Sequence, residues 1–197
     1  MRREVHVRFW EGLGVQSPGA TRLLVLFEYG EDAERFARVL PQRLAKFGLE
    51  VAPEKTRLIA FGAHAWRQGR AATGTFDFLG FTHHLGTSRT GQMVVVRHPT
   101  PKSVQRFLRE TKAWLHQHMH DAPREQQQAL AAKLRGLYQY FGLPLCYPPL
   151  AKVRYQVLRY WQATVRRRSQ TRRVTWAGVN QRPWFTLPAP RVLHPAV

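Results

Sequence analysis

The spacing of apolar residues in the first half of the chain predicts one helix among short strands. Residues 23–27 form an uninterrupted apolar run of strand length. Between residues 33 and 47 the apolar positions recur at helical spacing behind an acidic start, and Gly48 follows in the usual C-cap position. Pro41 falls inside this pattern, so we expect the helix to kink or break there.

Three more strands are expected after this helix, and little regular structure before it. The mixed polar and glycine-containing start of the chain predicts an irregular segment over residues 1–20. Turns are expected at His83-His84 and between Gly86 and Gly91. The strands themselves are predicted at residues 57–61, 76–79 and 93–96.

The second half of the chain has a helical pattern throughout. Ser103 is the expected cap of the first of three helices, and the second runs from near Pro123 to Gly142. The third helix carries its apolar positions between residues 150 and 165. Thr175 is expected to cap a last short helical turn.

The predicted fold class is therefore α+β, in four parts. An α+β part is followed by an all-helical part and by a proline-rich tail that we expect to lie extended. The boundaries are an irregular N-terminal segment at 1–20, the α+β part at 21–98, the helical part at 99–182 and the tail at 183–197.

The charge of the chain predicts a polyanionic partner. The 197 residues include 31 Lys and Arg against 12 Asp and Glu, a net charge of +19, and no acidic residue follows Glu125. A solvated helix surface normally mixes both signs, so charge of one sign indicates a polyanionic partner. The basic stretch lacks the broad apolar face of an interfacial helix, so we expect no membrane partner.

The remaining composition indicates a cytoplasmic protein. Cys146 is the only cysteine, which excludes an intrachain disulfide and favours a reducing compartment. No apolar run is long enough for a membrane span, and the basic start is not followed by the apolar core of a signal peptide.

Two groups of residues are the candidates for contact with nucleic acid. Five guanidiniums, which suit phosphate oxygens, lie within eight residues beside the polar Gln170. These are Arg166, Arg167, Arg168, Arg172 and Arg173. In the second group basic Lys152, Arg154 and Arg159 alternate with aromatic residues that can stack on unpaired bases. Tyr155 and Tyr160 fit both alternatives, stacking on bases and packing within the protein. Helical spacing favours a core position for Trp161.

A run of histidines is the only hint of a metal site, and we expect no metal and no cofactor. His116 and His120 would share a face at i,i+4 on a helix, a spacing that can bind zinc. No cysteine or acidic ligand motif accompanies them, so a polar helix face is the favoured interpretation.

Several blocks of sequence, in order, resemble group II intron-encoded reverse transcriptases, whose C-terminal domain is the maturase-specific thumb called domain X. The hexapeptide Phe76-Asp77-Phe78-Leu79-Gly80-Phe81 resembles the block after the palm of these enzymes. A block made of residues 46–49 and 53–57 resembles the one just before this hexapeptide. Residues 134–142 and the basic residues 167–176 resemble two blocks of the thumb. The tail at 187–191 resembles the family's C-terminal end less specifically. The resemblance implies a truncated reverse-transcriptase palm remnant at 21–98 and a maturase-specific thumb at 99–182. It also implies a primer-grip-like role for Phe78, Leu79, Gly80 and Phe81, for which simple packing is the alternative.

One departure from the family concerns its catalytic carboxylates. In the family, Tyr-Ala-Asp-Asp precedes the strand that corresponds to residues 25–27, and its carboxylates hold catalytic metal ions. Gly19-Ala20-Thr21-Arg22 stands at that place here. A cation there would repel Mg²⁺, so we expect no polymerase activity from this chain alone.

The resemblance thus implies RNA binding of the group II intron maturase type. The expected partner is structured RNA, in particular group II intron RNA, with DNA as a further candidate. One alternative is a subunit of a split reverse transcriptase, in which another chain supplies the missing palm and fingers and Mg²⁺ binds only in the completed enzyme. The other is a decayed mobile-element fragment without activity.

Overall fold

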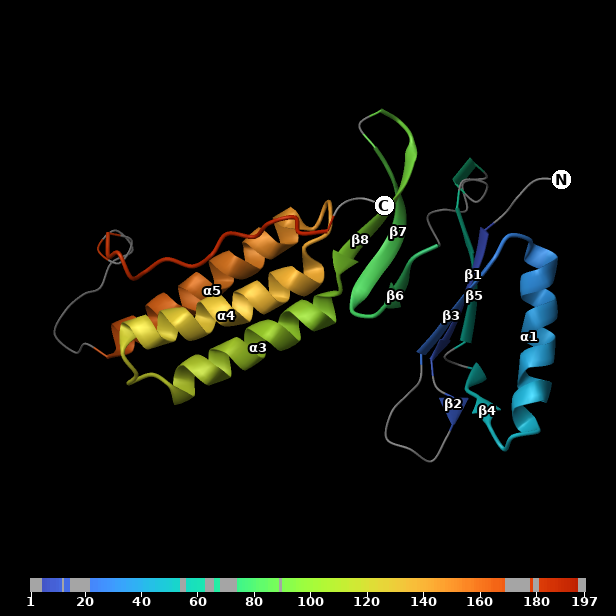
Figure 1. Ribbon diagram of the computed structural model, residues 1–197, viewed down its shortest axis with the longest axis horizontal. Helices are drawn as coiled ribbons and strands as arrows, with labels where there is room; N and C mark the ends of the chain where they lie inside the picture. The colour runs from blue at the N-terminus through green and yellow to red at the C-terminus, as the bar shows by residue number, and fades with distance from the viewer. Residues whose placement is uncertain are drawn as a thin grey trace. The chain divides into compact units, whose positions relative to one another are not determined.

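The chain forms two compact units in a computed structural model (Figure 1). The α/β unit comprises Met1–Phe76 and His83–Val96, and the helical unit comprises Asp77–Thr82 and Arg97–Val197. The residues that the structure describes are 5–11, 13–14, 22–53, 56–62, 66–67, 74–88, 90–168, 178 and 181–194. The presence of both helices and antiparallel sheets agrees with the predicted α+β class.

The α/β unit is built on a three-stranded antiparallel sheet with the order β3-β1-β5. Its strands are β1 (Val5–Glu11), β3 (Arg22–Phe27) and β5 (Thr56–Phe61). Helix α1 (Gly30–Ala45) covers one face of this sheet (Figure 1), where the rings of Phe27 and Phe36 lie 5.2 Å apart. A short second pair joins β2 (Leu13–Gly14) to β4 (Glu50–Val51).

The expectation of an irregular segment over residues 1–20 was wrong, because β1 is the central strand of the sheet. His6 pairs with Phe27 on one side and with Ala60 on the other. Val5, Val7 and Phe9 alternate with polar residues in the sequence, which is the period-2 pattern of a strand. Because polar residues interrupt the apolar ones, this strand contains no continuous apolar run by which it could be recognised.

Helix α1 confirms the predicted helix and continues past Pro41. The helix passes through Pro41 without breaking and ends at Ala45. Gly48 then takes φ +68°, and the N–H groups of Gly48 and Leu49 donate to the carbonyls of Ala45 and Leu44. This pair of bonds is a Schellman motif, for which a residue with positive φ is needed.

A third sheet, with the order β6-β7-β8, contains the hairpins predicted after the helix. Its strands are β6 (Phe76–Phe78), β7 (Phe81–Thr87) and β8 (Met93–Pro99). The expected turn at His83-His84 was wrong, since both lie within β7, and the first turn is Leu79-Gly80. These two residues have φ of +47° and +78°, the pattern of a two-residue type I′ hairpin turn. Leucine is uncommon at such a position, so the sequence gives no turn signal there.

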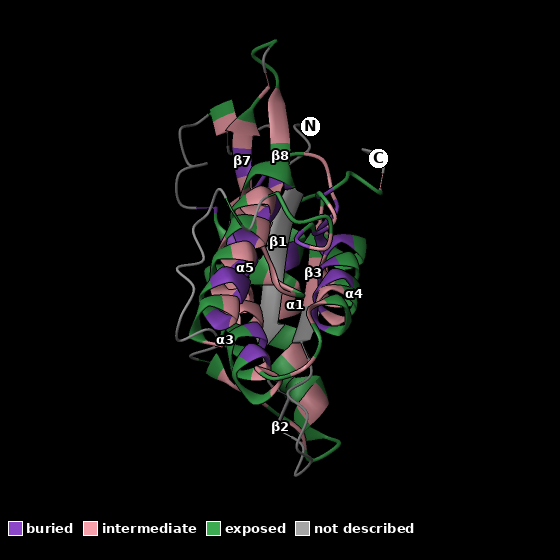
Figure 2. Ribbon diagram, turned by 90° about the vertical axis from the view of Figure 1, so that its left-hand side faces the viewer, coloured by how far each residue is buried: buried purple, intermediate pink, exposed green. Residues whose placement is uncertain are grey.

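The helical unit consists of three helices packed side by side (Figure 1), as predicted. They are α3 (Pro101–Gln117), α4 (Pro123–Phe141) and α5 (Tyr147–Arg167). Figure 2 shows the buried stripes of these helices, which meet in one core that includes Leu115, Leu134 and Trp161. The first helix begins earlier than expected, because Thr100 and not Ser103 is its cap: the Thr100 hydroxyl accepts from the N–H of Ser103 at 3.1 Å.

The proline-rich tail has no helix or strand between Phe185 and Leu193, in agreement with the extended conformation expected. It packs along the helices: the side chains of Phe185 and Leu187 are buried in the core, where Phe185 stacks on Trp161 at 4.6 Å between centroids. The tail is therefore an integral part of the helical unit. The turn expected at Thr175 lies outside the described residues.

Candidate nucleic-acid interface

One side of α5 carries four of the predicted binding residues at helical spacing. Lys152, Tyr155, Arg159 and Arg166 are all exposed, and they follow one another at intervals of three, four and seven residues. These intervals place them on a single face that runs for about 21 Å along the helix. The opposite face holds Val153, Val157 and Trp161, whose exposed fractions are 0–2%. The interpretation of Trp161 as a core residue is confirmed.

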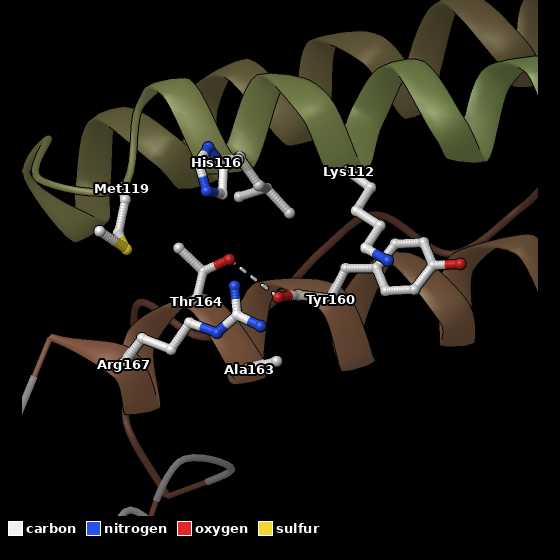
Figure 3. Close-up of a pocket in the computed structure, with 8 residues that line it drawn as sticks. Lys112, His116, Met119, Tyr160, Ala163, Thr164 and Arg167 are labelled. Atoms are coloured by element: carbon white, nitrogen blue, oxygen red, sulfur yellow. Dashed lines mark hydrogen bonds between the residues drawn. The ribbon is translucent and has the colours of Figure 1, made fainter.

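The exposed Arg167 lines a groove between α5 and α3 (Figure 3). Side chains from the two helices extend toward one another across this groove, with His116 on the α3 side and Thr164 on the α5 side. The ammonium of Lys112 lies 5.8 Å from the centroid of the Tyr160 ring. No acidic side chain is among the described residues that line the groove.

Helix α3 contributes a further row of basic side chains, which was not predicted from the sequence. Lys102, Arg109, Lys112 and His116 are exposed and follow one another at intervals of seven, three and four residues, so they share one helical face. Lys112 and His116 of this row border the groove. The regular spacing was visible in the sequence, but attention to the acid-free stretch after Glu125 excluded it. Together the two helices form what we call the α3–α5 basic face, which consists of Lys102, Arg109, Lys112, His116, Lys152, Tyr155, Arg159, Arg166 and Arg167.

Arg154, another predicted binding residue, is engaged within the protein. Its Nε and Nη2 atoms donate to the carbonyl oxygen of Leu187 at 3.1 and 3.0 Å. The phenol of Tyr138 donates to the neighbouring carbonyl of Pro188 at 3.1 Å. Burial raises the pKa of Tyr138 to about 12. These bonds attach the tail to α4 and α5.

Arg168 has a similar internal role at the other end of the helices. Its guanidinium donates through Nε to the carbonyl of Met119 and through Nη2 to the carbonyl of Asp121. Burial lowers the pKa of Arg168, while the nearby Asp121 acts in the opposite direction. Arg168 therefore holds the turn between α3 and α4. The other three predicted residues, Gln170, Arg172 and Arg173, lie outside the described residues.

The residues predicted as primer-grip-like surround the Leu79-Gly80 turn. Leu79 is 57% exposed, and its carbonyl accepts from the Tyr140 hydroxyl at 2.6 Å. Phe81 packs against Phe141 at 4.8 Å and Tyr140 at 5.5 Å between ring centroids. Phe78 is half-buried, and Gly80 borders a separate shallow hollow with Leu79 and Arg106. The turn is thus fastened to α4, and the primer-grip-like role stays a prediction.

The histidine run does not present two ligands on one helical face. Helix α3 ends at Gln117, so His120 lies beyond the helix that carries His116. His118 stacks on Trp114 at 4.4 Å between ring centroids. Within the described ranges, no three His, Cys, Asp or Glu side chains are close enough together to hold a metal ion.

Cys146 is a buried residue of the helical core. Its Sγ donates to the carbonyl of Arg97 at 3.0 Å, and burial raises the pKa of the thiol. A buried thiol with a raised pKa is inert, so the residue packs as a small apolar side chain.

The positive charge is concentrated in the helical unit. This unit holds 18 Lys and Arg against 4 Asp and Glu, a net charge of +14. The α/β unit holds 13 against 8, a net charge of +5. Because the helical unit carries most of the excess, it is the part of the protein whose self-repulsion a polyanion would relieve most.

Comparison with models of known protein families and with curated proteins found no match to this chain. Across the part of the chain that the structure describes, no helix combines the length and the apolar character that a membrane crossing requires.

Proposed function

We propose that the helical unit binds structured RNA through the α3–α5 basic face, in the manner that the resemblance to group II intron maturases implies. One observation carries the proposal: Lys112 of α3 and Arg167 of α5 line one groove, whose described lining has no acidic side chain, and each of the two helices carries a row of exposed Lys and Arg side chains. Cations that neutralise phosphates release condensed counterions, which favours binding.

The geometry of the two rows favours a folded RNA over an isolated strand. Packed helices lie roughly 8–10 Å apart, so the cations form a surface two rows wide. Along α5, the seven-residue interval between Arg159 and Arg166 corresponds to about 10 Å. A surface of this width can contact phosphates of two strands at once. Tyr155, which is 53% exposed between Lys152 and Arg159, offers a ring for an unpaired base.

The finer part of the proposal is that the partner is group II intron RNA and that this chain does not polymerise alone. Its support is the ordered set of sequence blocks and the Gly19-Ala20-Thr21-Arg22 stretch where the family has its carboxylates. Residues 19–21 lie outside the described residues, and Arg22 begins β3. A primer-extension assay on the purified chain tests this part: we expect no product with Mg²⁺, and extension without an added partner would contradict it.

The experiment for RNA binding compares two double charge reversals of equal size. Arg159→Glu/Arg166→Glu changes the α3–α5 basic face, whereas Arg124→Glu/Arg135→Glu changes exposed residues of α4, which contributes nothing to that face. In fluorescence anisotropy with a folded intron RNA, we expect the first variant to lose at least about tenfold in affinity. The second should lose much less. Equal losses would show that only net charge matters, and no binding by the wild-type chain would refute the proposal.

A further inference from the structure

Strand β3 is an edge of the sheet in the α/β unit. Among the residues that the structure describes, it pairs with β1 alone, in the order β3-β1-β5 (Figure 1). Within the described ranges, no strand therefore pairs with the backbone N–H and C=O groups on the other side of β3. Such an edge is a template for pairing with a further chain unless the protein protects it.

The usual protection is missing from β3. Its residues 23–27 are all apolar, with no proline, glycine or lysine, and Leu26 is 62% exposed. The other edge strand, β5, is different, since it carries the exposed Arg57 beside Leu58. A charge within an edge strand discourages pairing with a further strand. Of the two edges, β3 is therefore the one more prone to such pairing.

The sequence of β3 is complementary to itself when two copies run antiparallel. A register centred on Val25 places Val25 opposite its own copy and Leu24 opposite Leu26. The same register places Leu23 opposite Phe27 and, at both ends, Arg22 opposite Glu28. Apolar residues thus meet apolar residues, and opposite charges meet at each end, a combination that stabilises cross-strand pairs.

We propose that β3 pairs with β3 of a second copy of this chain, in the antiparallel register centred on Val25, to form a continuous six-stranded sheet. A second copy fits the edge better than a nucleic acid does, because the apolar run offers no cation to phosphates between Arg22 and Glu28. The α/β unit also has a net charge of only +5, so two of these units repel each other far less than two helical units would. The inference is independent of RNA binding by the helical unit.

Sedimentation equilibrium on the full chain without RNA tests the proposal. We expect a monomer–dimer equilibrium that Leu26→Lys abolishes, since a cation would then lie in the centre of the pairing. Leu26 is mostly exposed, so this variant should keep its fold. The matched control is Leu58→Lys on β5, where the leucine is 41% exposed, and it should dimerise as the wild type does. A wild-type chain that stays monomeric up to about 100 µM, or equal behaviour of the two variants, would overturn the proposal.

The register has its own test, which does not depend on the stability of any single variant. Glu28→Arg sets like charges against each other at both ends and should weaken dimerisation roughly tenfold or more. Adding Arg22→Glu restores opposite charges and should restore the dimer. Val25→Cys should form an oxidised dimer, while Leu26→Cys should not, because residue 26 faces residue 24 and lies about 7–8 Å from its own copy. Failure of the second charge reversal to rescue, or crosslinking at residue 26 alone, would contradict this register.

Discussion

The guanidinium of Arg154 donates two hydrogen bonds to the carbonyl oxygen of Leu187, at 3.1 and 3.0 Å. The two residues are 33 positions apart, and their contact attaches the extended tail to α5. Arg159, five residues further along the same helix, is instead exposed on the α3–α5 basic face. The helix therefore uses one arginine to hold the protein together and exposes the other to solvent.

The same substitution at these two arginines should therefore affect different properties, stability at Arg154 and RNA affinity at Arg159. Arg154→Met removes charged donors from the carbonyl of the buried Leu187 and should lower the free energy of unfolding by about 1–2 kcal/mol, with little change in RNA affinity. Arg159→Met should leave stability unchanged and weaken RNA binding about fivefold at 0.15 M salt, the worth of one released counterion. Urea unfolding and anisotropy titrations on both variants measure the two quantities. Loss of affinity in Arg154→Met without loss of stability would mean that Arg154 contacts RNA.

A buried polar chain links the three helices. The indole Nε1 of Trp161 donates to Gln126 Oε1 at 2.9 Å, and Gln126 Nε2 donates to the carbonyl of His118 at 2.5 Å. Both side chains are fully buried. Gln126→Leu leaves the indole N–H without a partner, while the His118 carbonyl keeps the N–H of Asp121 at 3.3 Å, and should destabilise the protein by about 1–3 kcal/mol. In a double-mutant cycle with Trp161→Phe, the combined loss should be smaller than the sum of the single losses. Strict additivity would show that the bond contributes nothing.

Tyr138 predicts a loss of stability at high pH. Burial raises the pKa of this phenol from 10.0 to about 12, so the folded state holds the proton more tightly than the unfolded state. The contribution of Tyr138 is therefore complete below pH 10 and is lost as the pH rises toward 12. Urea unfolding of the wild type and of Tyr138→Phe at pH 9, 10 and 11 measures the effect. The stability difference between the two proteins should shift by about 1.3 kcal/mol in favour of Tyr138→Phe between pH 9 and pH 11. A constant difference would contradict the assignment.

The Leu79-Gly80 turn predicts a stabilising substitution. Leu79 has φ +47°, a conformation that asparagine tolerates better than leucine, and its side chain is mostly exposed. Leu79→Asn should raise the midpoint of thermal unfolding, by about 0.5–1 kcal/mol in free energy. Gly80→Ala is the opposed control: at φ +78°, and with Ser103 Oγ only 3.2 Å from the added carbon, it should lower the midpoint. A lower midpoint for Leu79→Asn would show that the leucine side chain stabilises the turn.

The helices could be predicted from the sequence because each repeats its apolar positions over many turns. The ends of α4 at Pro123 and Gly142 were predicted from local residues alone. Strand β1 and the Leu79-Gly80 turn were missed for a physical reason. Neighbouring strands stabilise β1 on both sides, and hydrogen bonds to the turn from Tyr140 and Thr100 compensate for an unfavourable residue in it.

Contacts with residues distant in the sequence also limited the prediction of the candidate interface. Sequence composition located the excess of cations, and helical spacing identified the exposed row on α5. Nothing local distinguishes Arg168 from Arg167, however, because the carbonyls that engage Arg168 belong to residues 47 and 49 positions away. Of the five arginines predicted between residues 166 and 173, Arg168 is thus engaged within the protein, Arg166 and Arg167 are exposed, and Arg172 and Arg173 lie outside the described residues.

The salt dependence of RNA binding tests this shared face most directly. Lys112→Gln/Arg167→Gln removes one cation from each side of the groove, and Arg124→Gln/Arg135→Gln removes two from the exposed surface of α4. For the first variant, the slope of log K against log salt concentration should become shallower than in the wild type by about 2, one for each lost phosphate contact. The α4 variant should retain the wild-type slope. An unchanged slope in Lys112→Gln/Arg167→Gln would contradict RNA binding through the α3–α5 basic face.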